Sequence, residues 1–170
     1  MPNGKTMKIK TGKEEIYALL EEVKDPEIPV LSIRDLGILR DVEIDDSGLV
    51  TVVITPTYSG CPAMDTIERE VKESLAKAGF DVLVKSKISP AWTTDWMTEE
   101  GRIKLEEYGI APPAESTADK ASILGKPKVV RCPRCKSEDT SLISQFGSTA
   151  CKALYRCDDC LETFDYFKCI

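Results

Sequence analysis

Four cysteines in the last third of the chain have the spacing of a metal site. Cys132 and Cys135 form one C-x₂-C pair, and Cys157 and Cys160 form a second pair after 21 intervening residues. Each pair places two thiols on a tight turn, and two such pairs together supply tetrahedral coordination by four sulfurs. That geometry suits zinc or a single iron ion. We therefore expect the four thiols to bind one metal ion, with Zn²⁺ favoured and an iron–sulfur cluster as the alternative.

Two more cysteines, Cys151 and Cys169, lie in the same segment. They are candidate extra ligands, and their presence keeps the iron–sulfur cluster open. A redox-active dithiol at one C-x₂-C pair is a further reading, but it leaves the other pair unexplained. Residues 128–170 contain few large apolar side chains, so metal ligation is expected to supply folding free energy on the order of 10 kcal/mol.

A separate cysteine, Cys61, precedes Pro62 at the expected start of a helix. Proline favours the first helical position, which predicts Cys61 as the N-cap. Unpaired N–H groups and the helix dipole would there lower the pKa of the thiol and make it a nucleophile or a metal ligand. Thr57 and Ser59 carry hydroxyls in the same loop, and we include them with Cys61 as candidate residues for transient metal or cluster binding. A small, buried capping residue is an equally weighted alternative for Cys61.

Two carboxylates, Asp25 and Glu27, form a further candidate constellation around Pro26. They could lie at the mouth of the same sheet as Cys61, or they could be a helix stop followed by solvated acids. The chain contains no histidine. Its absence excludes Ser–His and Cys–His nucleophile pairs and the Glu-x-x-His di-iron site, so we do not expect a catalytic centre of these kinds.

Composition and charge narrow the class of protein. The net charge is −6, with 16 basic and 23 acidic side chains in residues 1–127 and 7 basic and 6 acidic ones in residues 128–170. Nucleic-acid binding requires a basic face, so none is expected. The sequence shows neither a membrane span nor the apolar stretch of a secretory signal, which predicts a cytoplasmic protein with reduced thiols.

Hydrophobic periodicity predicts the elements that position these residues. We expect the order α-β-β-α-β, which indicates a two-layer α+β sandwich, from residues 14–24, 38–44, 49–55, 64–78 and 80–88. A loop containing Trp92 and Trp96, read as core or interface anchors, leads to a short helix over 98–108 with Thr98 as its cap. The expected domains are 1–110 and 128–170, with an Ala/Pro/Ser-rich linker over 111–127.

Several segments resemble known families. The segments 25–30 (DPEIPV), 35–37 (DLG) and 55–62 (TPTYSGCP) resemble the iron–sulfur cluster assembly domain of the MIP-type, metal-sulfur cluster biosynthetic family. The segments 89–97 (SPAWTTDWM), 147–154 (GSTACKAL) and 164–170 (FDYFKCI) resemble the PaaD/PaaJ family of the phenylacetyl-CoA ring-epoxidase system. Together they extend the resemblance over nearly the whole chain.

The resemblance implies an accessory, non-catalytic role in phenylacetate degradation. It implies partners among the epoxidase subunits, such as the di-iron catalytic subunit or the reductase, and a maturation step in which Cys61 transiently binds iron or a cluster. It also implies an iron–sulfur assembly fold followed by a four-cysteine zinc-ribbon-like module. The alternatives are a stable structural subunit of the oxygenase, a zinc-ribbon nucleic-acid binder and a thiol oxidoreductase. Homo-oligomerisation is left open.

Overall fold

The computed structural model describes the backbone of residues 5–113 and 129–168, with side chains from residue 12 onward. By its internal contacts the chain divides into two compact units, residues 1–91 and 92–170. The described part of the first unit carries Cys61, and that of the second carries the four-cysteine cluster. None of the described helices has the length and apolar character that a membrane span requires.

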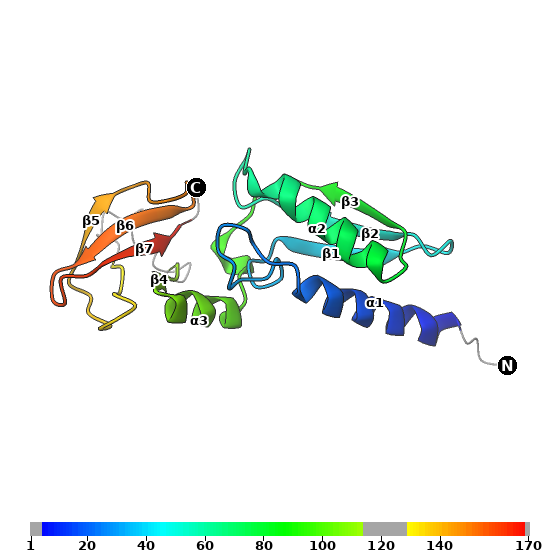
Figure 1. The fold of residues 1–170 in the computed structure, drawn as a ribbon, viewed down its shortest axis with the longest axis horizontal. Coiled ribbons are helices and arrows are strands. Elements are labelled where there is room, and N and C mark those ends of the chain that lie inside the picture. The colour runs from blue at the N-terminus through cyan, green and yellow to red at the C-terminus, as the bar shows by residue number, and fades with distance from the viewer. Residues whose placement is uncertain (1–4, 114–128, 169–170) are drawn as a thin grey trace. The chain divides into compact units, whose positions relative to one another are not determined.

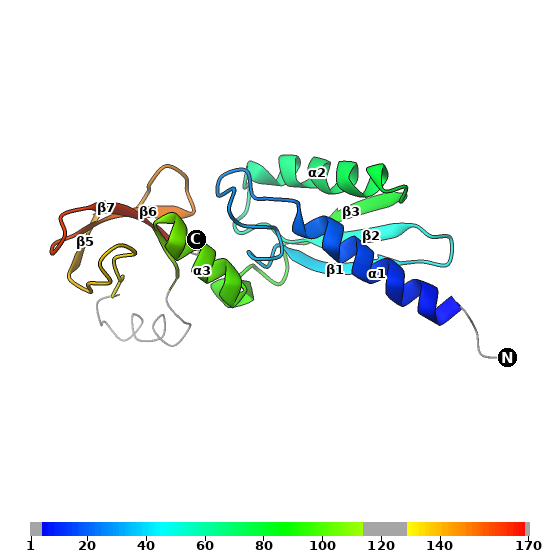
Figure 2. The same cartoon turned by 60° about the horizontal axis from the view of Figure 1, so that its bottom comes forward.

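The first unit follows the order expected from the sequence. Its elements are α1 (Lys5–Glu21), β1 (Leu39–Ile44), β2 (Val50–Ile54), α2 (Ala63–Lys77) and β3 (Val82–Ser86). The three strands form one sheet in the order β1-β2-β3. The α1 helix packs against α2 and β1, and α2 packs against β3, so both helices cover one face of the sheet (Figures 1 and 2). This arrangement confirms the two-layer α+β sandwich.

Two different connections build this sheet. β1 and β2 are antiparallel, and the turn between them is held by the Asp45 carboxylate, which accepts hydrogen bonds from the N–H groups of Ser47 and Leu49. β2 and β3 are parallel, so the chain must cross over between them, and α2 is that crossover. Because the carboxyl end of β2 leads directly into the loop before α2, the sheet fixes where the loop containing Cys61 begins.

The core of the first unit explains why the crossover is helical. Ile67, Val71 and Leu75 recur every four residues along α2, and all three are fully buried. The helix packs against β3, and Val50 and Val52 of the neighbouring strand β2 are also fully buried. A stripe of this kind stabilises a helix by tertiary packing more than by its intrinsic propensity.

The first helix differs from its expected limits of residues 14–24. It begins at Lys5 and ends at Glu21. Lys24 instead forms an isolated antiparallel bridge with Ser32, and the N–H of Ile33 donates to the carbonyl of Val23 at 3.0 Å. These pairings with residues 32 and 33 draw residues 22–24 out of the helix, and apolar periodicity gives no sign of them.

The second unit begins at Trp92. Its sheet has the order β4-β7-β6-β5, and its elements are η1 (Thr94–Trp96), α3 (Glu99–Tyr108), β4 (Ile110–Ala111), β5 (Thr140–Ser144), β6 (Lys152–Cys157) and β7 (Thr163–Phe167). The expected cap of α3 is confirmed, because Thr98 Oγ1 accepts a hydrogen bond from the N–H of Gly101 at 3.0 Å. Trp92 is a core residue, with its ring edge-to-face against Phe167 at 6.0 Å.

The short strand β4 belongs to the same sheet as the four-cysteine segment, because it pairs in parallel with β7. Residues 92–111 therefore belong to the second compact unit, together with the sheet that carries the cysteines. The domain limits expected from the sequence, 1–110 and 128–170, stay a prediction, and most of the expected linker lies outside the described residues.

Candidate metal and thiol sites

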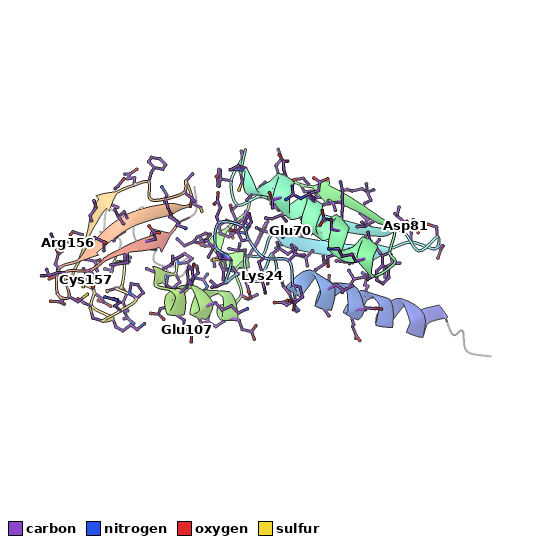
Figure 3. All side chains as sticks on the ribbon, viewed as in Figure 1. Lys24, Glu70, Asp81, Glu107, Arg156 and Cys157 are labelled. Atoms are coloured by element: carbon purple, nitrogen blue, oxygen red, sulfur yellow. The ribbon has the colours of Figure 1, made fainter. Side chains whose placement is uncertain are left out.

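The two C-x₂-C pairs meet at one end of the β5–β6–β7 sheet. Cys157 ends β6, as Figure 3 shows, and Cys160 follows in the turn to β7. The sulfur atoms of Cys132, Cys135, Cys157 and Cys160 all lie within 4.8 Å of one another. The Sγ atoms are 3.8 Å apart for Cys132 and Cys160, and 3.5 Å apart for Cys135 and Cys157.

The two C-x₂-C turns, 132–135 and 157–160, share one backbone geometry and are called the knuckles below. The N–H of the first cysteine in each pair donates across its turn, from Cys132 to the carbonyl of Ser137 and from Cys157 to that of Glu162, each at 2.9 Å. The residue after the second cysteine, Lys136 or Leu161, has a positive φ, of 66° and 63° respectively. For residues with a side chain such a φ costs on the order of 1–3 kcal/mol. The sequence carried no signal for these two strained positions.

The thiols of this cluster differ in acidity. The N–H of Cys160 donates to Cys157 Sγ at 3.5 Å, and this bond is the largest cause of a Cys157 pKa lowered to about 7. For Cys160 the N–H of Glu162 lowers the pKa, but burial and the three neighbouring thiols outweigh it and raise the pKa to about 12. Four thiols so close together cannot all ionise unless a cation offsets their charge.

The donor set fits a single tetrahedral ion. Zn–S bonds of about 2.3 Å in a regular tetrahedron place the sulfurs about 3.8 Å apart, and the two sulfur–sulfur distances given above are 3.8 and 3.5 Å. In an iron–sulfur cluster the four thiolates are shared among two or four irons, which separates at least some of the sulfurs further than in a one-ion site. The second unit therefore holds a cluster of thiols that can bind one metal ion.

The structure does not bring Cys151 to this cluster. Cys151 directly precedes β6, whereas Cys157 ends it, so the strand separates the two residues by about 20 Å. The Cys151 thiol is buried, and its Sγ lies 3.1 Å from Thr149 Oγ1. Cys169 lies outside the described residues, so its expected role stays a prediction.

Cys61 lies in the loop between β2 and α2 and is half-buried. Gly60, with φ +77°, adopts the left-handed conformation that this loop requires, and the N–H of Cys61 donates to the carbonyl of Tyr58 at 3.3 Å. The helix begins at Ala63 with Pro62 as its N-cap, so the expectation that Cys61 is the N-cap is wrong by one residue. Its sulfur still accepts a hydrogen bond from the N–H of Ala63.

The expected acidity of Cys61 is also wrong in direction. Burial raises the pKa of the thiol above its ordinary value, and the carboxylates of Glu27 and Asp25 add to this effect. The N–H of Ala63 and the Tyr58 hydroxyl oppose it without reversing it. Helix N-terminal donors are therefore present, but desolvation and two acidic neighbours outweigh them.

The two acidic residues play different local parts. Asp25 is buried, and its Oδ1 accepts hydrogen bonds from the N–H groups of Glu27 and Ile28, both at 2.8 Å. It therefore holds the turn that follows α1. Glu27 is half-buried, and its charge raises the Cys61 pKa more than that of Asp25 does. The structure thus brings Asp25, Glu27 and Cys61 within electrostatic range of one another.

The two hydroxyl residues of the loop are less closely tied to the thiol. Thr57 is half-buried and Ser59 is exposed. Among the described residues, neither makes a hydrogen bond to Cys61. The hydroxyl that does reach the sulfur belongs to Tyr58, which sequence reasoning noted in the loop but did not select.

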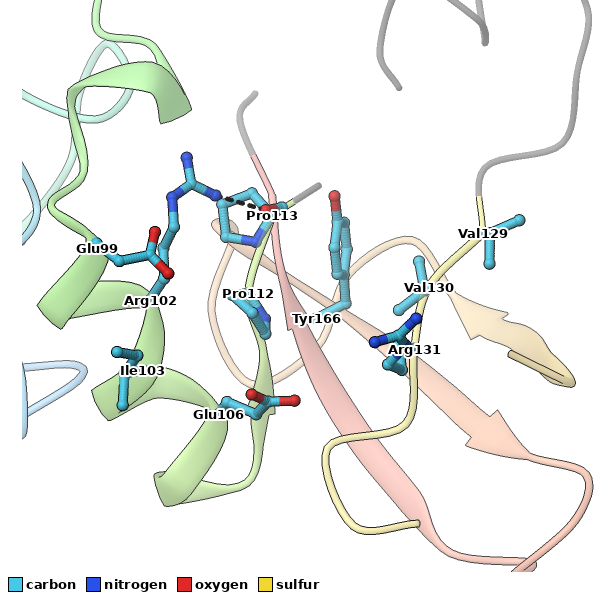
Figure 4. Close-up of a pocket in the computed structure, with 10 residues that line it drawn as sticks. All are labelled: Glu99, Arg102, Ile103, Glu106, Pro112, Pro113, Val129, Val130, Arg131 and Tyr166. Carbon is cyan, nitrogen blue, oxygen red and sulfur yellow. Dashed lines mark hydrogen bonds between the residues drawn. The ribbon is translucent and has the colours of Figure 1, made fainter. Parts of the chain in front are cut away.

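A cavity of about 540 Å³ lies within the second unit, next to α3 (Figure 4). Most of its charged side chains already have structural partners. Arg102 donates to the carbonyls of Pro113 and Thr94 at 2.6 and 2.7 Å, and Glu106 pairs with Lys136 at 2.7 Å. None of the candidate site residues lines this cavity, so we assign it no chemistry.

Comparison with known proteins separates the two parts of the chain. Residues 13–85 match the family model described as iron-sulfur cluster assembly protein, and residues 116–168 match the PaaD zinc beta ribbon domain. An Escherichia coli (strain K12) protein, described as the D component of 1,2-phenylacetyl-CoA epoxidase, is 55% identical over 92% of each chain.

Two other relatives match only the first part. The Fe-S protein maturation auxiliary factor YitW of Bacillus subtilis (strain 168) is 40% identical over 55% of this chain and 92% of its own length. A crystal structure of a domain of unknown function, DUF59, from Bacillus anthracis aligns with a TM-score of 0.55 and 29% identity. It covers 59% of this chain and 96% of that domain.

Proposed function

The chain belongs to the PaaD family of 1,2-phenylacetyl-CoA epoxidase components, and on that premise we propose that it is a non-catalytic maturation subunit of the epoxidase. In this role it delivers iron or an iron–sulfur centre to another subunit of the complex in the cytoplasm. The comparison with Fe-S maturation factors supports the proposal, because they match the unit that carries Cys61. The arrangement of Cys61, Glu27 and Asp25 carries it.

The chemistry of this arrangement suits a transient cargo. A cation held near the Cys61 thiol and two carboxylates is attracted by both acids and favours loss of the thiol proton. When the cation leaves, burial and the same acids favour the protonated thiol again. Glu27 and Asp25 thus attract the incoming cation and also protect the empty thiol from remaining ionised.

The four-cysteine cluster has a different role in this proposal. We propose that Cys132, Cys135, Cys157 and Cys160 hold one Zn²⁺, whose contribution is to hold the two knuckles together. The short distances between their sulfurs favour one ion over a cluster. Metal analysis and an absorption spectrum of anaerobically purified protein test this point. A colourless protein with one zinc is expected, and a brown protein with iron and sulfide at these thiols would contradict it.

The delivery role is tested by Cys61→Ser in cells that express the whole epoxidase. We expect the iron content and the activity of the catalytic subunit to fall together, while the variant keeps its zinc. Cys151→Ser is the matched control, because that thiol lies in the other unit and outside the four-sulfur cluster. Unchanged iron in the client with Cys61→Ser would remove the delivery role.

A second candidate function is a permanent structural subunit of the oxygenase. One observation favours it: the edge strand β5 carries Leu142 and Ile143, which are 48% and 53% exposed. Exposed aliphatic side chains on an edge strand often mark an interface. Co-purification with the catalytic subunit at a fixed stoichiometry is expected under this alternative. Loss of this protein from the mature complex would exclude it.

A further inference from the structure

A buried cation that no role described so far uses lies where the loop between β5 and β6 enters β6. Lys152, the first residue of β6, is only 7% exposed. Lysine is almost never buried to this extent unless it is paired. Its ammonium group donates to Ser148 Oγ at 3.3 Å, and this is its one hydrogen bond within the described parts of the chain.

Other basic side chains of this segment show how unusual this is. Arg131, Lys136 and Arg156 each pair with a carboxylate, at 3.0, 2.7 and 2.8 Å, and Arg134 pairs with Glu162. The remaining one, Lys168, donates to the carbonyl of Gln145 and lies over the ring of Phe146 at 4.2 Å. Across residues 129–168, no carboxylate lies within ion-pair distance of Lys152.

The loop around this ammonium group is held in place by its own backbone. The N–H of Gly147 donates to the carbonyl of Lys152 at 2.8 Å, and the N–H of Lys152 donates to the carbonyl of Thr149 at 3.2 Å. Gly147 also lies so close to β7 that a Cβ atom would come 2.9 Å from Asp165 Oδ1. A side chain at this position would therefore require the Asp165 carboxylate or the loop to shift.

The same loop offers further hydrogen-bond donors. Ser148 is exposed, so its hydroxyl connects the buried ammonium group with solvent. Thr149 Oγ1 lies 3.1 Å from Cys151 Sγ, which leaves the threonine hydrogen available when the thiol donates. Within the described residues, the N–H groups of Ser148, Thr149 and Ala150 donate to no acceptor. These N–H groups lie within four residues of the Lys152 ammonium group and can donate to a bound ligand.

We propose that Ser148, Thr149 and Lys152 form a binding site for a phosphate group. A phosphate carries negative charge and several acceptor oxygens, so it can use an ammonium group, hydroxyls and backbone N–H groups together. Two sources share this chemistry: free inorganic phosphate, and the 3′-phosphate of a coenzyme A thioester of the kind that the family's enzyme is named for. The site lies far from Cys61 in sequence, and its test is independent of metal delivery.

The experiment measures binding to the full-length, zinc-loaded protein by calorimetry and by NMR. The probes are inorganic phosphate, coenzyme A and 3′-dephospho-coenzyme A. We expect each phosphate-bearing probe that binds to shift the amide signals of residues 147–152. Tighter binding of coenzyme A than of its dephospho form identifies the 3′-phosphate as the ligand. Equal binding of these two probes excludes the 3′-phosphate, because both carry the diphosphate, and binding of inorganic phosphate that neither coenzyme exceeds identifies free phosphate.

Three variants test the residues. Lys152→Met keeps the length of the side chain and removes the charge, and it should weaken binding by at least about tenfold. Lys168→Met is the matched control, because this lysine belongs to the same end of the sheet but has its own partners, and it should leave the affinity within about threefold. Ser148 is exposed, so Ser148→Ala should fold normally. This variant tests the site even if Lys152→Met does not fold.

Two results would overturn the proposal. The first is the absence of any shift at residues 147–152 with all three probes. The second is an affinity that Ser148→Ala and Lys152→Met leave unchanged. In phosphate-free buffer, Lys152→Met should also melt at the same or a higher temperature than the parent, because it removes a buried charge that lacks a counterion.

Discussion

The two units of this molecule use cysteine in opposite ways. In the first unit the core is formed by the sheet and two helices, and Cys61 lies half-buried in a loop beside it. In the second unit the described core around the knuckles is small and includes Cys132 and Cys157 themselves. A thiol that the fold does not require is free to bind and release a cargo. Thiols that complete the core have to keep their ligand.

The largest effect that would test this comparison is removal of the metal. Chelation should unfold β5, β6 and β7 and leave β1, β2 and β3 intact, because structural zinc contributes about 10 kcal/mol or more to folding. Hydrogen exchange followed by mass spectrometry can report both sheets in one sample. If the amides of β5–β7 stayed protected without metal, the thiols would not be part of what holds the ribbon together.

A core substitution in the first unit should show the reverse pattern. Leu75→Ala removes a fully buried side chain from α2 and should lower the free energy of unfolding of that unit by about 2–5 kcal/mol. The zinc content should not change. Denaturant unfolding combined with metal analysis measures both. A loss of zinc in this variant would show that the two units do not fold independently.

Within the first unit, Asp25 and Glu27 should differ in how much they contribute to stability. Asp25→Ala removes the acceptor of two backbone N–H groups and should cost about 1–3 kcal/mol of stability. Glu27→Gln should stay within about 0.5 kcal/mol of the parent protein. Thermal melts of both variants measure these losses of stability. Asp25→Asn is the control, because it keeps the acceptor. Equal losses for Asp25→Ala and Glu27→Gln would contradict the separate parts assigned to these residues.

The smallest effect concerns the acidity of Cys61. The negative charge of Glu27 raises the pKa of this thiol, so Glu27→Gln should lower that pKa and increase the fraction of thiolate at pH 8. Alkylation of Cys61 by iodoacetamide should then be about two- to threefold faster in the variant. Because burial raises the pKa above its ordinary value of 9.0, the rate in the parent protein should keep rising above pH 9. A slower reaction in Glu27→Gln would contradict the conclusion that Glu27 raises the pKa of Cys61.

Local patterns were sufficient for much of the fold. The four-residue recurrence of Ile67, Val71 and Leu75 predicts α2, and a Gly-containing turn before a β-branched run predicts β1 and β2. The cap at Thr98 is likewise a property of a few neighbouring residues. The limits of α1 were predicted less well, because apolar periodicity does not report the backbone pairing between Lys24 and Ser32.

By itself, the sequence determined which residues can bind metal and in what order the elements follow, because the C-x₂-C spacing and apolar periodicity are properties of neighbouring residues. Only the tertiary structure decided the acidity of Cys61, the separation of Cys151 from the four-sulfur cluster and the burial of Lys152. Each of these depends on desolvation or on the distance to charges contributed by remote parts of the chain. Such quantities arise only when the sheets and loops have packed.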